Sequence, residues 1–189
     1  MKKSLIALAV MASMMHAECL VEPNGTPVIG WEAYKTAAKV GVKGSFGSVK
    51  ASGIDASESV AGVLKGSRVM IETASVDSKN PGRDAKLATY FFGVMAGKVI
   101  DATVVSVDGK EKTGNVTVAI TMNGVTRNVP MRYSATESEI VAEGYVDLAD
   151  FSALAAVASI NKACYELHQG KTWQDVAIRF TLPIKTQCP

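Results

Sequence analysis

The chain has 189 residues, of which 48% are hydrophobic and 20% are charged, enough apolar material for one domain with a sizeable core. Its 20 lysines and arginines and its 18 aspartates and glutamates are spread along the chain without a basic cluster, which argues against nucleic acid as a partner. No linker, low-complexity segment or internal repeat divides the chain.

Residues 1–17 have the pattern of a secretory signal peptide. Lys2 and Lys3 precede a short apolar run, and Ala17 supplies a small residue for cleavage. We therefore expect export, cleavage after Ala17 and a mature domain at residues 18–189. Removal of this segment leaves 18 basic and 18 acidic residues, so the mature chain is neutral. No later stretch approaches the roughly 20 apolar residues of a spanning helix, and no integral membrane segment is expected.

Alternation of apolar and polar residues predicts that most of the chain forms β-strands. Two-residue turn signals at Asp108-Gly109 and Asn123-Gly124 indicate antiparallel hairpins. The pattern is typical of an all-β fold, an antiparallel eight-stranded barrel that leaves no free edge. The predicted strands cover residues 28–36, 40–46, 49–54, 68–76, 99–107, 116–122, 125–133, 139–148 and 176–184.

Short helices are predicted at two points where the strand pattern stops. Residues 55–58 form a plausible capping box before Val60, and Gly66 would end that helix. Asn80 is a good N-cap for a second helix, because Pro81 suits the first helical position. This second helix is expected to end at Gly93.

A longer helix is predicted at residues 152–169, lying across the barrel. Asp150 or Ser152 would cap its start, and Gly170 would stop it. Apolar side chains at helical spacing would form its buried stripe, namely Ala153, Val157, Ile160, Cys164 and Leu167.

Residues that could carry chemistry are few. Without residues 1–17 the chain has a single histidine, His168, in the last predicted turn of a helix, where a cation usually faces the terminal carbonyls. Three widely spaced cysteines do not have zinc spacing, so no metal site is expected. In the predicted strand 139–148 the carboxylates Glu139, Glu143 and Asp147 share one face, which favours a solvated outer wall over a catalytic pair.

The apolar faces of the strands leave two alternatives open. An eight-stranded barrel is either filled by its own side chains or holds one small ligand, and the alternation pattern does not decide between them. The inward-facing candidates in the later strands are Val118, Ile120, Val129, Met131, Ile178, Phe180 and Leu182.

Two sequence blocks resemble the signature of the YceI-like family. In the first, a strand end at residues 74–78 leads into Arg83-Asp84, Leu87 and Phe91-Phe92. The second, residues 114–131, is similar to the family's hairpin, with a strand, an Asn-Gly-Val-Thr turn and a return strand. Weaker similarity extends over nearly all of the mature chain.

This resemblance implies a periplasmic, lipocalin-like barrel that binds a long-chain isoprenoid or fatty amphiphile in its lumen, with no enzymatic activity and no cofactor. Many members carry a histidine in the first strand and another just before the leucine of the Arg-Asp block, where this chain has residues 31–34 and Lys86. Ligand contacts made by those histidines therefore do not carry over. The lumen candidates are Trp31, Val42, Phe46, Ile71, Phe92, Val118, Ile120, Val129, Met131, Ile178, Phe180 and Leu182.

Several alternatives stay open beside the carrier hypothesis. Arg83 and Asp84 either fix a turn, which we favour, or contact a lipid headgroup. The chain is alternatively a non-enzymatic structural or interaction protein with a filled barrel, or, less favoured, a lipid hydrolase or isomerase that uses carboxylates. A homodimer is compatible with the sequence.

A disulfide is expected between Cys19 and Cys188. In a closed meander the first and last strands are antiparallel neighbours, so the residue before one strand lies near the end of the other. Cys164 falls on the apolar stripe of the predicted long helix and should remain a buried thiol.

Overall fold

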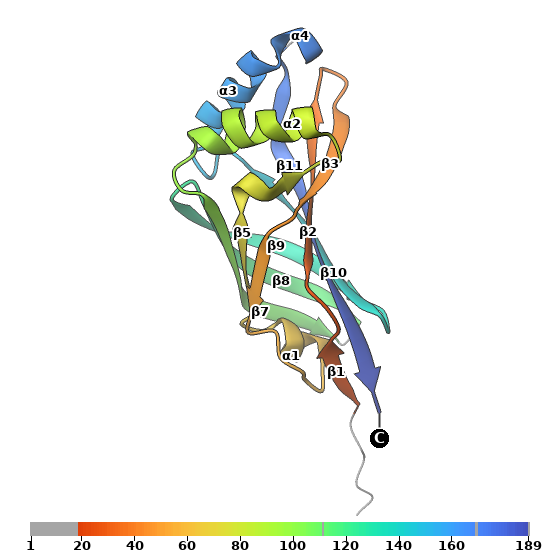
Figure 1. The fold of residues 1–189 in the computed structure, drawn as a ribbon. Coiled ribbons are helices and arrows are strands. Elements are labelled where there is room, and N and C mark those ends of the chain that lie inside the picture. The colour runs from red at the N-terminus through yellow and green to blue at the C-terminus, as the bar shows by residue number, and fades with distance from the viewer. Residues whose placement is uncertain (1–18, 111, 169, 189) are drawn as a thin grey trace, which may run out of the picture.

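A computed structural model describes residues 19–110, 112–168 and 170–188 (Figure 1). The predicted signal peptide lies outside the described residues. Alternating apolar residues form a strongly curled antiparallel sheet, as the sequence indicates. Its strands are β1 (Leu20–Pro23), β2 (Val28–Lys35), β3 (Val40–Phe46), β4 (Val49–Ser52), β5 (Arg68–Glu72), β6 (Val76–Asp77), β7 (Val99–Lys110), β8 (Thr113–Met122), β9 (Val125–Ala135), β10 (Glu139–Asp147) and β11 (Thr172–Gln187).

The sheet curls on itself in the order β4-β5-β7-β8-β9-β10-β11-β2-β3-β6. Only residues 47 and 48 separate β3 from β4, so one bent strand pairs with β5 at one end of this path and with β6 at the other. The amide of Gly47 donates to the Ser75 carbonyl at 2.8 Å, and the Glu72 amide donates to the Ser48 carbonyl at 3.1 Å. With β3 and β4 counted as one strand, and β5 and β6 as another, the wall is the predicted eight-stranded lipocalin-like barrel, to which β1 is added at one edge of β11.

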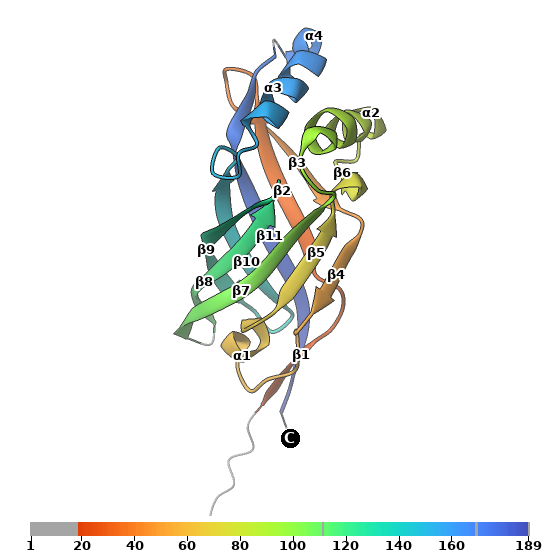
Figure 2. The ribbon, with the colours of Figure 1, turned by 90° about the vertical axis from the view of Figure 1, so that its left-hand side faces the viewer.

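Helices lie at both ends of the barrel (Figure 2). At one end is α1; at the other, α2, η2 and η3 follow one another and α3 packs against η2 and η3. The helical segments are α1 (Val60–Leu64), η1 (Thr73–Ser75), α2 (Pro81–Lys86), the π-helix η2 (Leu87–Phe91), η3 (Phe92–Val94), α3 (Leu154–Ala163) and α4 (Tyr165–His168).

Both predicted short helices form, but the N-cap predicted for the first of them is wrong. The side chain of Asn80 accepts a hydrogen bond from the Arg83 amide at 3.0 Å, which confirms it as the N-cap of α2. The N-cap of α1 is Ser59, whose hydroxyl accepts from the Gly62 amide at 3.1 Å, so the predicted capping box at residues 55–58 is wrong. The helical region begun at Asn80 also continues past Gly93, to Val94.

The predicted strand 68–76 is interrupted. Its residues alternate between buried and exposed, but β5 ends at Glu72 and η1 turns the chain towards β3, where Val76 pairs with Phe46. The hydroxyl and amide of Thr73 both donate to the Lys98 carbonyl at 3.0 Å, while the Ser75 hydroxyl donates to the Glu72 carbonyl at 2.6 Å. These side-chain hydrogen bonds to the backbone compete with the hydrogen bonds of the β-ladder, and the strand bends across the barrel at this point.

One of the two predicted hairpin turns is confirmed and one is wrong. Asn123 and Gly124 both have positive φ, 51° and 74°, as a two-residue turn of this hand requires. The ladder between β7 and β8 instead continues through Gly109, which pairs with Gly114. A Cβ on either glycine would meet the backbone of the other strand, and it would also meet the buried Tyr133 side chain, its hydroxyl at Gly109 and its ring at Gly114, so the two glycines serve close packing and not a turn.

The predicted long helix is broken into α3 and α4 at Cys164. Neither predicted cap forms: Ala153 is the N-cap residue of α3, and Ser152 has a φ of +54°. Leu167 is 67% exposed and does not belong to the buried stripe. Gly170, with a φ of +62°, follows α4 as predicted.

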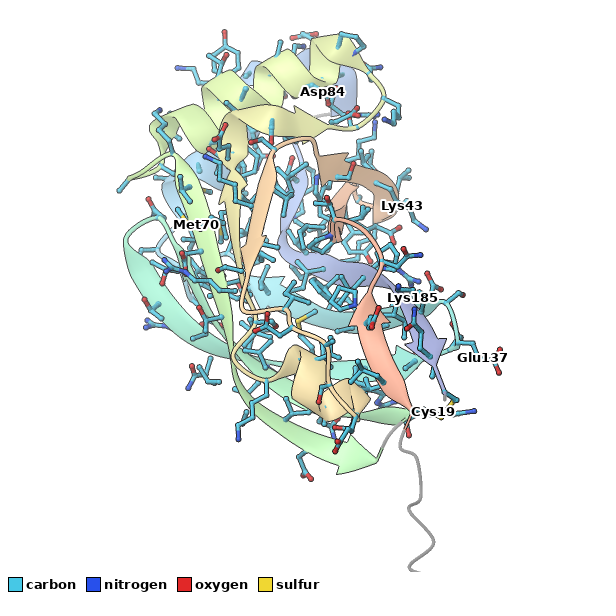
Figure 3. The ribbon with its side chains drawn as sticks, turned by 60° about the horizontal axis from the view of Figure 1, so that its bottom comes forward. Cys19, Lys43, Met70, Asp84, Glu137 and Lys185 are labelled. Atoms are coloured by element: carbon cyan, nitrogen blue, oxygen red, sulfur yellow. A yellow bond between two sulfur atoms is a disulfide. The ribbon has the colours of Figure 1, made fainter. Side chains whose placement is uncertain are left out.

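The predicted disulfide is present at the barrel end that carries β1. Cys19 and Cys188 are bonded, with their Cα atoms 4.2 Å apart, and Cys164 is a buried free thiol. Leu20 pairs with Gln187, so the ends of the described chain run antiparallel beside each other. Figure 3 shows Cys19 at the end of the molecule opposite Asp84.

A candidate ligand cavity in the barrel lumen

The barrel encloses an apolar cavity of about 130 Å³. It extends between Leu64 of α1 and Phe46 of β3, and Ser67 and Arg179 are the only polar residues among the described ones that line it. The lining residues are Ile29, Gly30, Trp31, Phe46, Leu64, Ser67, Val69, Ile71, Ile100, Ala102, Val104, Val116, Val118, Ile120, Met122, Met131, Ala142, Val146, Ile178, Arg179 and Phe180.

Most of the lumen candidates named from the sequence border this cavity. Those that do are Trp31, Phe46, Ile71, Val118, Ile120, Met131, Ile178 and Phe180. The other four lie elsewhere. Val129, paired with Val118, and Leu182, paired with Ile140, are buried in the core; Phe92 is buried in η3; and Val42 is half-buried in β3.

Glycines beside large side chains shape the middle of the lumen. A row of paired residues crosses five strands, in the order Met131, Gly144, Ile178, Trp31 and Gly44. A Cβ on Gly44 would overlap the Trp31 ring, and one on Gly144 would lie 2.8 Å from Cγ of Met131. The large side chains therefore lie flat over the two glycines, which leaves space along the barrel axis.

Sequence reasoning missed several lining residues, although their signal was present. Val116 stands two positions before Val118, and Ala142 and Val146 occupy the apolar face of the acidic strand. Strand periodicity of two would have found them. Leu64 and Ser67 had no such signal, because they line the cavity only through the placement of α1 and the loop after it.

Aromatic side chains close the cavity beneath the helices. The ring of Phe46 meets the ring of Phe92 edge to face, with centroids 5.9 Å apart, and Phe92 meets Phe91 in the same way at 4.9 Å. Phe91 ends the π-helix and Phe92 begins η3, so this helical segment carries the aromatic plug. The plug meets the cavity lining through Phe46.

Arg83 and Asp84 both bind Ser78. The amide and hydroxyl of Ser78 donate to Oδ1 of Asp84, the first at 2.9 Å. Arg83 donates to the Ser78 hydroxyl at 2.7 Å and to its carbonyl at 2.9 Å. Ser78 is buried, and these bonds tie it to the first turns of α2; the turn-stabilising role that we favour stays a prediction.

The lumen lacks the groups that acid-base chemistry needs. No histidine, cysteine or carboxylate stands among the described residues that line it, and the described chain contains no group of three or more side chains suited to a metal ion. Burial raises the pKa of Tyr133, with the charge of Asp108 adding to the effect, but Tyr133 does not line the cavity. Glu143 of the acidic strand is exposed and paired with Arg179.

A second hollow, of about 480 Å³, lies between α3 and the start of β11 and is polar. Its lysine side chains already contact other residues of the protein. Lys39 binds Asp175 at 2.6 Å and stands 4.8 Å from the centre of the Trp173 ring, and Lys171 stands 4.3 Å from it. This hollow does not suit an apolar ligand.

The size of the lumen limits what it holds without movement. Pockets for drug-sized ligands measure about 300–1,000 Å³, and a cavity of about 150 Å³ holds benzene. The 130 Å³ cavity therefore admits a small apolar group, and a long chain requires side chains such as Met131 or the aromatic plug to rearrange.

Comparison with known proteins gives a consistent result. The sequence profile of the YceI-like domain matches residues 23–184. A search of proteins with curated functions finds no match. In the described residues no helix is both long and apolar enough to cross a membrane.

Solved structures with the same fold share little sequence with this chain. A polyisoprenoid binding domain from Saccharophagus degradans has a TM-score of 0.59 at 16% identity, covering 91% of this chain and 100% of that domain. BcnA from Burkholderia cenocepacia has a TM-score of 0.57 at 14% identity, covering 83% and 95%. A YceI protein from Campylobacter jejuni has a TM-score of 0.55 at 18% identity, covering 78% and 85%.

Proposed function

The chain belongs to the YceI-like domain family, and from this premise we propose that it is a periplasmic carrier that binds one long-chain isoprenoid or fatty amphiphile in the barrel lumen. The observation that carries the proposal is the cavity itself, which lies within the barrel and is lined almost entirely by apolar side chains. One structural neighbour, the Saccharophagus degradans domain, is a polyisoprenoid binding domain, which supports the same class of ligand.

Hydrophobic burial would drive binding without any covalent step. Each buried methylene contributes about 0.8 kcal/mol, against an association cost of roughly 4 to 15 kcal/mol. A chain of about 16 carbons or more is needed for a useful surplus on these figures. The two polar lining residues are already engaged, because Ser67 donates to the Leu64 carbonyl and Arg179 pairs with Glu143, and we place the polar head outside the lumen.

The disulfide supports the proposed compartment. A bond between Cys19 and Cys188 fits an oxidising environment, as the periplasm is. Export would depend on residues 1–17, and the mature chain would begin at Glu18.

The rival function is that of a structural or interaction protein with a filled barrel. One observation favours it: the cavity is smaller than ordinary ligand pockets. The two functions differ in whether the wild-type protein carries or takes up lipid.

A charge placed in the lumen tests the carrier proposal. In Phe180→Glu the carboxylate would replace a cavity-lining ring, while Thr181→Glu places the same charge on the next residue, which faces the opposite side of β11. We expect Phe180→Glu to lose bound long-chain lipid in native mass spectrometry, and Thr181→Glu to retain it. Thermal melting should show that both variants fold.

Ile120→Glu gives a second lumen variant if Phe180→Glu does not fold. The carrier proposal fails if gently purified wild-type protein holds no lipid and takes none up from long-chain isoprenoids or fatty amphiphiles. The filled-barrel function would then replace it.

A further inference from the structure

Two segments at the helical end of the barrel, residues 85–100 and 151–165, differ in charge from the wall. These two segments contain Lys86, Lys98 and Lys162 and no carboxylate. The outer wall instead mixes both signs in ion pairs between neighbouring strands, namely Glu32–Lys43, Lys50–Glu72, Arg68–Asp101, Glu143–Arg179 and Glu22–Lys185. These two segments therefore carry only cations, although carboxylates lie next to them in the sequence, Asp84 in α2 and Glu166 in α4.

Exposed apolar side chains gather on this helical end. Tyr90 of η2, Val94 of η3 and Leu154 of α3 are 44%, 53% and 48% exposed, and we call these three residues the apolar rim. The carboxamide of Asn123 accepts from the Ala96 amide at 2.7 Å and donates to the Ser152 carbonyl at 3.0 Å. Asn123 therefore links the two segments that carry Val94 and Leu154, each of which stands two residues from one of these contacts.

The apolar rim lies directly over the lumen. Phe91 and Phe92, between Tyr90 and Val94 on the same helical segment, form the aromatic plug against Phe46. Met122, which precedes Asn123, lines the cavity. The plug thus lies between the apolar rim and the apolar lining of the cavity.

We propose that the apolar rim docks on a lipid bilayer that contains anionic lipids, so that a hydrocarbon chain passes between bilayer and lumen past the plug. This proposal rests on the carrier function. An interfacial surface needs apolar side chains that enter the acyl boundary, an aromatic residue at headgroup depth and flanking cations, which the rim and the three lysines supply. Three lysines are few, so insertion of the rim must provide most of the binding.

Vesicle sedimentation tests the docking surface. Vesicles of phosphatidylcholine with phosphatidylglycerol should bind the wild-type protein more strongly than pure phosphatidylcholine vesicles. Val94→Asp and Leu154→Asp should each weaken binding by about ten-fold or more, since charged groups are costly at the acyl boundary. Tyr145→Asp is the matched control, because Tyr145 is 68% exposed on the outer wall, and it should bind as the wild type does.

The lysines provide an independent test. Each of Lys98→Gln and Lys162→Gln should weaken binding to the anionic vesicles by about five-fold, and change binding to pure phosphatidylcholine little. Equal binding of wild type and both lysine variants to the anionic vesicles would overturn the proposed charge complementarity.

A comparison of lipid uptake from detergent with uptake from vesicles distinguishes membrane docking from lipid binding in the lumen. Val94→Asp and Leu154→Asp should load a long-chain isoprenoid from detergent as the wild type does, but load it more slowly from vesicles. Absence of vesicle binding by the wild type overturns the docking proposal. So does a wild-type dimer that the rim variants dissociate. If the wild type binds vesicles through the rim but takes up no lipid from either source, the carrier function fails and the docking surface stands.

Discussion

At the scale of single residues, the pairing of Trp31 with Gly44 sets the width of the lumen. A Cβ on Gly44 would overlap the Trp31 ring and lie 2.8 Å from the Asp77 carbonyl oxygen. We expect Gly44→Ala to displace the ring and to lower the free energy of unfolding by about 1–3 kcal/mol, as overpacking of a filled site does. Urea unfolding measures the loss, and tryptophan fluorescence reports the displacement.

Gly30→Ala is the matched control for this change. Gly30 lies beside Trp31 on β2, and the nearest atom to an added Cβ is 3.7 Å away, an ordinary contact. The control should keep its stability within about 0.5 kcal/mol. Equal losses in the two variants would show that the Trp31 ring does not depend on the glycine beneath it.

The two dipeptide turn signals had different outcomes. The turn that depends on local backbone conformation was predicted correctly, and the one where packing between strands determines the structure was predicted wrongly. The sequence Asn-Gly at 123 and 124 requires positive φ at both residues, and this local demand is enough for a hairpin. Asp-Gly at 108 and 109 carries the same signal, but there a Cβ on the glycine would meet the backbone of the paired strand at Gly114, and the hydroxyl of the buried Tyr133 from β9 lies 3.0 Å away. Contact with a residue far along the chain is not visible in a dipeptide.

At the scale of elements, the link from Ser78 to Asp84 holds α2 in place. Asp84→Ala would leave the amide and hydroxyl of buried Ser78 without this acceptor, and an unsatisfied buried donor costs about 1–3 kcal/mol. We expect that loss in urea unfolding, together with faster hydrogen exchange in α2. Asp55→Ala, which removes an exposed carboxylate from a loop, should change neither.

The same variant distinguishes the two roles considered for Arg83 and Asp84. A turn role predicts lower stability with the same lipid affinity once the protein is folded. Unchanged stability with weaker lipid binding would instead favour contact with a headgroup.

Helices and strands whose ends are set by capping or turn residues could be predicted from the sequence. Those whose form depends on tertiary contacts could not. The Asn80 cap and Pro81 define the start of α2. The π-helix at Leu87–Phe91 has no comparable signal; it occurs where Phe91 and Phe92 pack at the end of the lumen. The four-residue strand β1 was missed because it is too short for alternation, although its Val21 is buried.

At the scale of the whole molecule, alternation along the chain was sufficient for the barrel, while the sequence analysis named eight of the residues that line the lumen. The meander order places the first and last strands together, and β2 and β11 do pair. The volume of the lumen was not predictable. It depends on rows such as Met131, Gly144 and Ile178, in which residues from three strands share the space, and on Leu64 from α1.

The disulfide between Cys19 and Cys188 closes a loop that contains nearly the whole described barrel, with a sequence separation of 169. Cross-linking so large a loop stabilises the fold by about 5 kcal/mol in the chain-entropy model, as an upper figure. The β1–β11 ladder keeps the two ends together in the folded state without the bond. We therefore expect the Cys19→Ser, Cys188→Ser double variant to keep the wild-type fold but to unfold at lower urea concentration, with its free energy of unfolding lowered by up to this amount.

Reductant should lower the free energy of unfolding of the wild type and of Cys164→Ala by the same increment, and should leave that of the double variant unchanged. Non-reducing peptide mapping that places Cys164 in a bridge, or a wild type that reductant does not destabilise, would contradict this assignment.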